Sequence, residues 1–379
     1  MKEFDMPSPL SHLVPALEVL AENAEILPAT GQAVEDLMRP HQEEVEDEIL
    51  NNDALRTDTL IETPNRDVYQ PTPGLARRER HVFRYFLDGS RRSYFIGTAL
   101  EHERSTPIQV AQIGAAVVHR REDGEVETAR SKRKLLLLLS RENVSDHVWE
   151  QLKAQEGEGL RLEDISEEDQ LTEAIGNKVD LRSRGGGKVN WAMHQLEIKL
   201  ANSLSEREES EWLIVDGSLN FEPPIDTPQT IGVAKSFTKR PVFTIGRGPR
   251  KETYPLYRLL SGLPAAHRTC AFSARSGRVA FWYVRMREQR QMDYPMMGVV
   301  KVEMRNPSAE AIPSEKIDLI SRGLVAERSV TPYGSDARWH AHLYPIYLAE
   351  QVVKNGFWSR EVIRTAIHWP RRPIDSGSV

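Results

Sequence analysis

The chain has 379 residues, of which 39% are apolar and 28% charged, a balance that excludes a disordered or fibrous protein. Cys270 is the only cysteine and no apolar run is longer than the six residues Val279–Val284, which excludes disulfide frameworks, cysteine-ligated zinc and membrane-spanning helices. Residues 1–60 carry 14 acids against three Lys or Arg, so the net charge of −6 leaves +5 for the rest of the chain, which favours polyanion binding there.

The N-terminal segment is acidic and expected to be helical. Apolar residues at helical spacing predict a helix over 8–26, and a second helix is predicted over 31–55. The prolines of 63–74 predict a linker. No basic and then apolar pattern of a signal peptide opens the chain, so we expect a cytoplasmic protein without a membrane partner. We therefore predict an acidic helical extension with a linker (1–75), followed by the main domain (76–379).

The main domain is predicted to begin with strands. Apolar patterning places them at 81–88, 92–100 and 108–119, joined by short turns. The stretch Lys134–Ser140 offers another strand, although a leucine-rich run also suits a helix. A charged insert, helical over much of its length, is then predicted at about 141–188.

A basic, glycine-rich stretch closes this insert. Residues 182–188 predict a flexible loop, which is not a phosphate-binding P-loop because the leading Gly and the final Ser or Thr are missing. A helix over 189–207 and a strand over 211–216 follow.

The C-terminal half mixes strands with helices. A hairpin turning at Ser276-Gly277 is predicted from 266–273 and 278–287, with a third strand at 296–304. Helices are predicted at 312–325 and from 343 onward. A meander of strands, then helices, then further strands favours a mixed α/β sheet over a doubly wound parallel one.

Two stretches share one pattern. Arg84–Ser90 and Trp212–Ser218 are both apolar runs that end in Asp-Gly-Ser. Each reads as a buried strand that brings its carboxylate, Asp88 or Asp216, to the strand end, where ligands of α/β sheets bind. Asp-Gly-Ser is also an ordinary turn tripeptide. Because carboxylates are hard oxygen ligands, the pair predicts a site for Mg²⁺ or Mn²⁺.

Glu197, on the predicted helix before the second Asp-Gly-Ser motif, could supply a third oxygen ligand.

Basic residues follow the second motif. Residues 235–251 contain six Lys or Arg and no acid, which suits a phosphate backbone, although a solvated loop fits as well. The predicted nucleic-acid contacts are Lys235, Lys239, Arg240, Arg247, Arg250, Lys251 and Tyr344.

A late block, Trp339–Glu350, places His342 and Tyr344 just before a predicted helix. Such residues can act as a metal ligand, a proton carrier or a phosphate contact. An aromatic packing corner is the alternative interpretation.

Taken in order, these motifs resemble the NurA nuclease family. The resemblance rests on the two Asp-Gly-Ser motifs, the helical Glu, Ile-Gly-Val-Ala-Lys-Ser at 231–236 and His-Leu-Tyr-Pro-Ile-Tyr-Leu-Ala at 342–349, and it covers about residues 80–355. The acidic extension and the insert at 141–188 have no matching feature. By position, Asp88, Glu197 and Asp216 match the metal-binding acids of the family, and Lys235 and His342 match later polar positions.

The resemblance implies an α/β protein with an RNase H-like mixed sheet flanked by helices. It further implies an exo- or endonuclease for DNA that uses Mn²⁺ (or Mg²⁺), a homodimer, and a HerA-type hexameric ATPase translocase as partner. Two metal ions held by the three acids would activate water and stabilise the leaving oxygen, with Lys235 beside the phosphate and His342 completing the metal shell or moving a proton.

Other functions stay open at this point. A non-catalytic DNA-binding or adaptor subunit of a HerA-type motor fits the same pattern, as does an RNase H-like nuclease that acts on RNA or junctions. DNA repair and anti-phage defence are equally compatible with the sequence.

Overall fold

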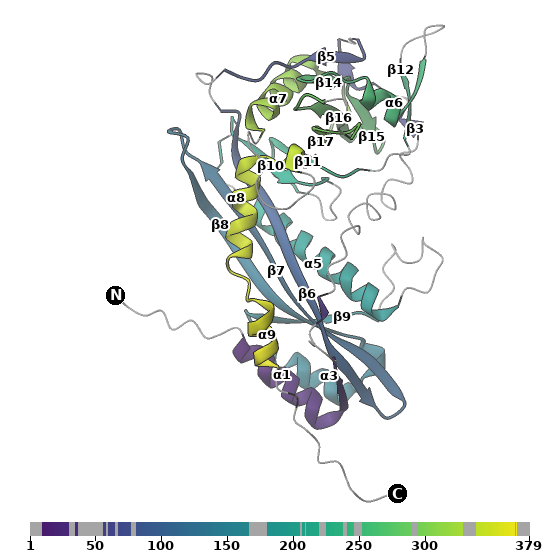
Figure 1. Cartoon of the computed structure of the whole chain (residues 1–379), viewed down its shortest axis with the longest axis vertical. Coiled ribbons are helices and arrows are strands. Elements are labelled where there is room, and N and C mark those ends of the chain that lie inside the picture. The colour runs from purple at the N-terminus through teal and green to yellow at the C-terminus, as the bar shows by residue number, and fades with distance from the viewer. Residues whose placement is uncertain are drawn as a thin grey trace, which may run out of the picture.

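A computed structural model gives the arrangement of the chain (Figure 1). It describes residues 10–29, 35–36, 56–57, 60–64, 67–76, 81–166, 180–204, 207–208, 210–219, 225–237, 241–245, 252–289, 294–328, 339–367 and 369.

One large mixed sheet organises the fold, as the sequence predicts. Its order is β5-β14-β16-β17-β11-β10-β6-β7-β8-β9, with β1 and β2 on β6 and β15 on β16. The described strands are β1 (Glu25–Pro28), β2 (Glu35–Asp36), β5 (Tyr69–Pro71), β6 (Phe83–Glu101), β7 (Arg104–Arg120), β8 (Val126–Leu139), β9 (Leu160–Asp164), β10 (Trp212–Asp216), β11 (Thr230–Ala234), β14 (His267–Thr269), β15 (Phe272–Ala274), β16 (Val279–Arg285) and β17 (Val299–Arg305).

The sheet is mixed, with both parallel and antiparallel neighbours on each side of β6. β6, β7 and β8 are antiparallel neighbours. β10 runs parallel to β6, and β11 runs parallel to β10. β17 is antiparallel to β11 and leads to the remaining strands.

The long hairpin of β6 and β7 links three hydrophobic cores. At about 3.4 Å per residue, β6 is roughly 60 Å long. Phe86 packs in a cluster with residues of α8 (Tyr344–Lys354), and its neighbour Leu87 points to the other face, into a cluster with α5 (Leu181–Asn202). Tyr94, further along, packs in a third cluster with α1 (Leu10–Asn23).

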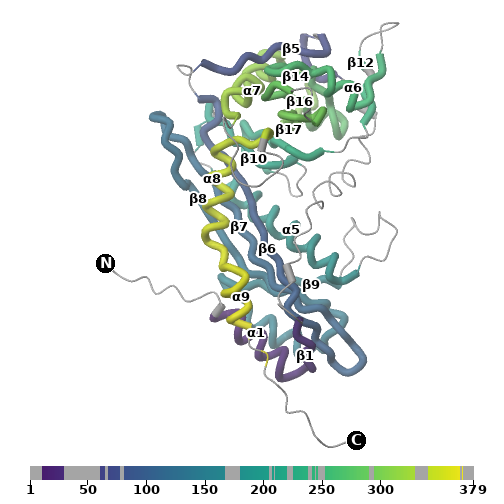
Figure 2. Tube along the Cα trace, in the orientation of Figure 1, coloured from purple at the N-terminus to yellow at the C-terminus, as the bar shows by residue number. Residues whose placement is uncertain are grey.

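Helices cover both faces of this hairpin. In Figures 1 and 2, α8 and α5 lie along it, and the core clusters place them on opposite faces. α1, α3 (Asp146–Lys153) and α9 (Arg360–Ala366) gather at one end, beside the 3-10 turn η2 (Arg141–Asn143). The five leucines at the end of β8 form an uninterrupted apolar run because both faces are covered: alternate ones pack in the α5 cluster and in the α1 cluster.

The other end of the molecule holds a fourth cluster, rich in aromatic residues. It joins β16 to α6 (Leu256–Ser261) and to the small sheet of β12 (Val242–Ile245), β13 (Glu252–Pro255) and β3 (Arg56–Thr57). The remaining described elements are the pair β4 (Glu62–Thr63) and β18 (Ile312–Pro313), the helix α7 (Ser314–Glu327) and the 3-10 turn η4 (Trp339–Ala341).

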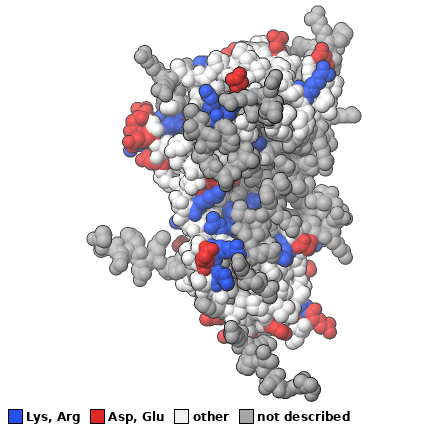
Figure 3. Space-filling view, in the orientation of Figure 1, with Lys and Arg blue, Asp and Glu red and all other residues white. Residues whose placement is uncertain are grey.

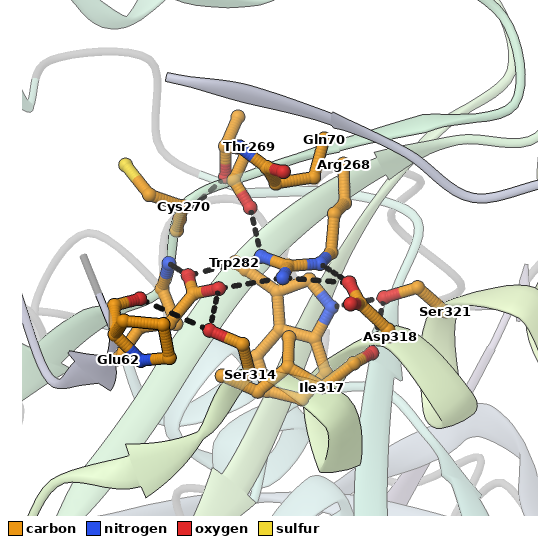
Figure 4. A network of polar contacts seen from close by, with 12 residues as sticks. Glu62, Gln70, Arg268, Thr269, Cys270, Trp282, Ser314, Ile317, Asp318 and Ser321 are labelled. Carbon is orange, nitrogen blue, oxygen red and sulfur yellow. Dashed lines mark hydrogen bonds and ion pairs between the residues drawn. The ribbon is translucent and has the colours of Figure 1, made fainter. Parts of the chain in front are cut away.

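A buried polar network fastens residue 62 to this end of the sheet (Figure 4). The Arg268 guanidinium, fully buried, donates to Glu62 over 2.6 and 3.0 Å and to Asp318 over 2.7 Å. Glu62 also accepts hydrogen bonds from the Ser314 hydroxyl and the Ala271 amide. The network therefore joins three stretches of chain that are far apart in sequence.

Several N-terminal expectations need correction. The helix at 8–26 is confirmed as α1, but within 31–55 the described residues 35–36 form a strand on β6, and the others lie outside the described part. The linker predicted at 63–74 is wrong for 69–71, which pair with β14 as β5. Backbone pairing and the Glu62 network integrate this segment into the main fold.

Two expectations about the core are also wrong. The strands predicted at 81–88 and 92–100 are one strand, because Gly89 and Ser90 keep pairing with Ala115 and Gly114 of β7. The loop predicted at 182–188 is the start of α5, where the Asp180 carboxylate caps the helix by accepting from the Ser183 amide over 3.1 Å. The insert contains α3 and β9, and its residues 167–179 are outside the described part.

The remaining elements follow the prediction closely. The strands at 108–119, Lys134–Ser140 and 211–216 are confirmed as parts of β7, β8 and β10, and the predicted helix at 189–207 is the rest of α5. The hairpin around Ser276-Gly277, the strand at 296–304 and the helices at 312–325 and after 343 also form, as β15 with β16, β17, α7 and α8.

Candidate active site

Two aspartates lie side by side in the middle of the sheet. β10 is parallel to β6 and pairs Val215 with Leu87, so Asp216 and Asp88 are the next residues on adjacent strands. Asp216 is the last residue of β10, after which Gly217 turns the chain with a φ of +102°. The predicted approach of the two carboxylates therefore occurs, although Asp88 lies within a strand and not at its end.

The edge of β6 next to these acids is paired only in part within the described residues. β10 covers the edge of β6 only up to Leu87, and β2 begins to pair at Tyr94. In the described part of the chain, no strand pairs with this edge between Asp88 and Ser93.

Asp88 is held in an unfavourable electrostatic setting. Its residue exposure is only 8%, and burial raises the pKa of its carboxyl well above the usual range. The negative charges of Asp216, Glu350 and Glu197 raise this pKa further, and the Lys235 charge lowers it. A buried carboxylate among like charges is a group that a bound cation would stabilise.

Lys235 supplies a positive charge at this point. It follows the last residue of β11, the neighbour of β10, and its Nζ lies 2.7 Å from Oδ2 of Asp216. The predicted proximity of Lys235 to the acids is thus present.

Glu197 reaches the site from the opposite face. α5 packs in the cluster that contains Leu87, whereas Asp88 alternates to the α8 face with Phe86. The Glu197 carboxylate lies against Gly89, where an added Cβ would come within 2.9 Å of its Cδ atom. Its Oε2 is 2.7 Å from Nδ1 of His194, one turn earlier on α5.

Glu350 is the acid that sequence reasoning missed. It lies on α8, on the same face as Asp88, and its charge acts on Asp88 more strongly than that of Glu197. α8 approaches the sheet closely because β7 has Gly114 there, where an added Cβ would lie 2.7 Å from Cγ1 of Val353. Lys354, one turn further along, forms an ion pair with Glu350. The Glu-x-x-x-Lys spacing resembles an ordinary helical surface pair, which hid this signal.

The late block contributes the start of α8. His342 is buried just before the helix, and Tyr344 in the first turn is exposed. At 1.5 Å per residue, Tyr344 is about 9 Å along the helix axis from Glu350. His340 instead accepts a hydrogen bond from the Gly298 amide at the start of β17. The roles of His342 and Tyr344 stay predictions.

The basic segment is described only in part. Lys235 has its place at the acids, and Lys239, Arg240, Arg247, Arg250 and Lys251 lie outside the described residues. Figure 3 shows Lys and Arg gathered near the middle of the view. Arg92 lies 6.0 Å above the Phe357 ring and donates to the Trp358 carbonyl, while Arg133 packs against Gly356.

The acids suit a hard divalent cation in chemical type. Within the described residues no three His, Cys, Asp or Glu side chains are already arranged around one metal position. Asp88 and Asp216 are nevertheless adjacent, and Glu350 and Glu197 flank them from the two faces. The repulsion that raises the pKa of Asp88 is what an ion there would relieve.

Neither the comparison with protein-family models nor the comparison with curated proteins finds a match for this chain. Among the described helices, none combines the length and apolar character needed to cross a bilayer.

Proposed function

We propose that this protein is a metal-dependent nuclease that hydrolyses phosphodiester bonds in DNA. The observation that carries the proposal is the pair Asp88 and Asp216 on adjacent parallel strands, with Lys235 bound to one of them. Carboxylates prefer Mg²⁺ or Mn²⁺, and a lysine beside them suits the phosphate that such ions hold.

The sheet topology supports an RNase H-like fold. Three antiparallel strands, β6, β7 and β8, are followed, after α3 and β9, by the crossover helix α5 and by β10 and β11 parallel to the first strand. This order, β8-β7-β6-β10-β11, is the arrangement expected of an RNase H-like sheet. Together with the motifs it supports a relationship to NurA nucleases, and with it a homodimer, a HerA-type ATPase partner and a cytoplasmic location.

Each residue has a chemical task in this proposal. Asp88 and Asp216 would hold Mn²⁺ or Mg²⁺, assisted by Glu350 and Glu197 from the two faces. When bound, such ions activate water and stabilise the leaving oxygen. Lys235 balances the charge of Asp216 and can hold the phosphate next to it.

The test is cleavage of end-labelled single- and double-stranded DNA by the purified protein with Mn²⁺, Mg²⁺ or EDTA. A double variant, Asp88→Asn with Asp216→Asn, is compared with Asp146→Asn plus Asp226→Asn, which changes two exposed, ion-paired carboxylates instead. We expect the first variant to lose at least about a thousandfold in rate and the control to lose little. Equal rates for the two variants, at equal Mn²⁺ affinity by calorimetry, would refute the proposal.

A binding or adaptor subunit of a motor is the second candidate. It is favoured by the Lys235–Asp216 ion pair, which neutralises one acid without a metal. Absence of cleavage on DNA and RNA, even with a HerA-type motor and ATP, together with retained DNA binding, would establish this alternative over the nuclease.

A further inference from the structure

The face of the sheet that carries α5 has basic side chains that the proposed reaction does not use. On β8, Lys132 and Lys134 share their face with Leu136, which packs in the α5 cluster. Arg161 of β9 is the register partner of Leu136 and so lies on this face too. Lys199 lies in the last turn of α5. These residues form a strip between the helix and the two strands.

The cations of this strip crowd one another. Burial, and then the charges of Arg161, Lys132 and Lys199, lower the pKa of Lys134. Glu163, a described acid at the strip, is buried and lies 2.6 Å from Nε of Arg161, and its charge raises the pKa of Lys134. Among the described residues, no acid forms an ion pair with Lys132, Lys134 or Lys199.

An aromatic side chain marks the other end of the strip. Lys188, whose charge acts on Glu163, places its Nζ 5.3 Å from the ring centroid of Trp191. Trp191 is 41% exposed, which is unusual for so large an apolar side chain. Helical spacing puts Lys188, Trp191 and Lys199 on one side of α5, with about 16 Å between the two lysines.

We propose that this strip binds a single strand of nucleic acid, with phosphates on the basic residues and a base stacked on Trp191. The basic strip consists of Lys132, Lys134, Arg161, Lys188 and Lys199. Single-strand binders combine a cationic track with aromatic platforms. The proposal rests on the nuclease function, because it assigns a holding surface for the substrate next to the helix that carries Glu197.

A purely structural role explains less. Lysines on a free sheet edge discourage association between sheets. That role requires neither the cations on α5 nor the exposed Trp191, whereas a bound strand uses both. The spacing of the cations along α5 and β8 further suits a repeating phosphate chain rather than one small anion.

The test measures binding of a labelled oligothymidylate of 20 nucleotides by fluorescence anisotropy in EDTA, across a salt series. The variant Lys132→Ala/Lys134→Ala/Lys199→Ala is compared with Arg104→Ala/Lys153→Ala/Arg278→Ala, which removes three exposed cations elsewhere. We expect the first to bind at least about tenfold more weakly and to lower the salt slope by about 2. Trp191→Ala should weaken oligothymidylate binding about fivefold or more and leave polyphosphate binding unchanged. The single change Lys132→Glu provides a mild variant if the triple one unfolds.

The possible outcomes test the basic strip, the nuclease function and the stacking on Trp191 separately. Equal binding by the two triple variants, with metal-dependent cleavage intact in the wild type, would overturn the basic strip and leave the nuclease. Binding lost only in the strip variant, without any cleavage by the wild type even when a HerA-type motor and ATP are added, would support the strip and overturn the nuclease. Polyphosphate and oligothymidylate binding equally reduced in Trp191→Ala would overturn the assignment to stacked bases.

Discussion

Replacing Arg268 by Met should expose the energetic role of the buried network in Figure 4. Arg268 and Glu62 are both buried, and the change leaves the Glu62 carboxylate without its guanidinium partner, while the Ser314 and Ala271 hydrogen bonds remain. Removing one partner of a buried ion pair costs about 3–5 kcal/mol. We therefore expect the unfolding free energy to fall by about that amount.

Equilibrium urea unfolding measures this effect. Trp282 is a convenient fluorescent probe, because its Nε1 donates to the Ser321 hydroxyl within the same network. The double variant Arg268→Met/Glu62→Gln should recover part of the loss, since the buried Glu62 charge is then removed together with its partner. A loss below about 1 kcal/mol in the single variant, or no recovery in the double one, would refute this account of the network.

The same network predicts a pH dependence. Burial alone raises the pKa of Glu62, but the hydrogen bonds and charge of Arg268, with Ser314 and Ala271, bring it below the usual 4.5. A depressed pKa in the folded state gives stability that is present above pH 4.5 and is lost as the pH falls through the folded-state value. As the pH falls below 4.5, the unfolding free energy of Glu62→Gln should therefore decrease less than that of the wild type. Equal decreases in the two proteins would contradict a lowered pKa of Glu62.

Three further changes test the site and its support. Gly89→Ala should lower Mn²⁺ affinity about tenfold in calorimetry, because the new Cβ displaces the Glu197 carboxylate, and unchanged affinity would remove Glu197 from the site. Glu350→Gln should lower that affinity about tenfold while the far-ultraviolet circular dichroism stays the same; full affinity would make Glu350 a packing residue only. Gly114→Val should cost about 1–3 kcal/mol in urea unfolding, since it pushes α8 away at Val353, and unaltered stability would argue against this close approach.

The main elements of the fold follow from the sequence where side-chain periodicity is strong. The strand around Asp216, the helix α7 and the hairpin at Ser276-Gly277 are predicted because apolar spacing and turn residues agree. Asp88-Gly89-Ser90 is different: its composition favours a turn, but pairing with β7 continues through it. Backbone pairing with β7 keeps this stretch in a strand, and a local sequence pattern does not reveal such pairing.

The candidate site is likewise predictable only in part. Asp88, Asp216 and Lys235 share the strand-end and basic patterns that sequence analysis uses. Glu350 has no such pattern, because its position depends on how α8 packs over β7. For Glu197 the sequence suggests the right helix, but only the structure reveals that Gly89 admits its carboxylate and that it comes from the opposite face.

The long hairpin has a consequence for the order in which the site forms. β6 and β7 are joined by only two residues, one of which, His102, has a positive φ, so their pairing closes a very short loop. The contact of β6 with β10 instead closes a loop of more than 120 residues, and such contacts form slowly. We therefore expect the hairpin of β6 and β7 to form early and to position Asp88. The pair of acids should be complete only later, when β10 docks on β6 and brings Asp216 next to Asp88. In pulsed hydrogen exchange during refolding, the backbone amides of the strand that contains Asp88 should become protected before those of the strand that contains Asp216.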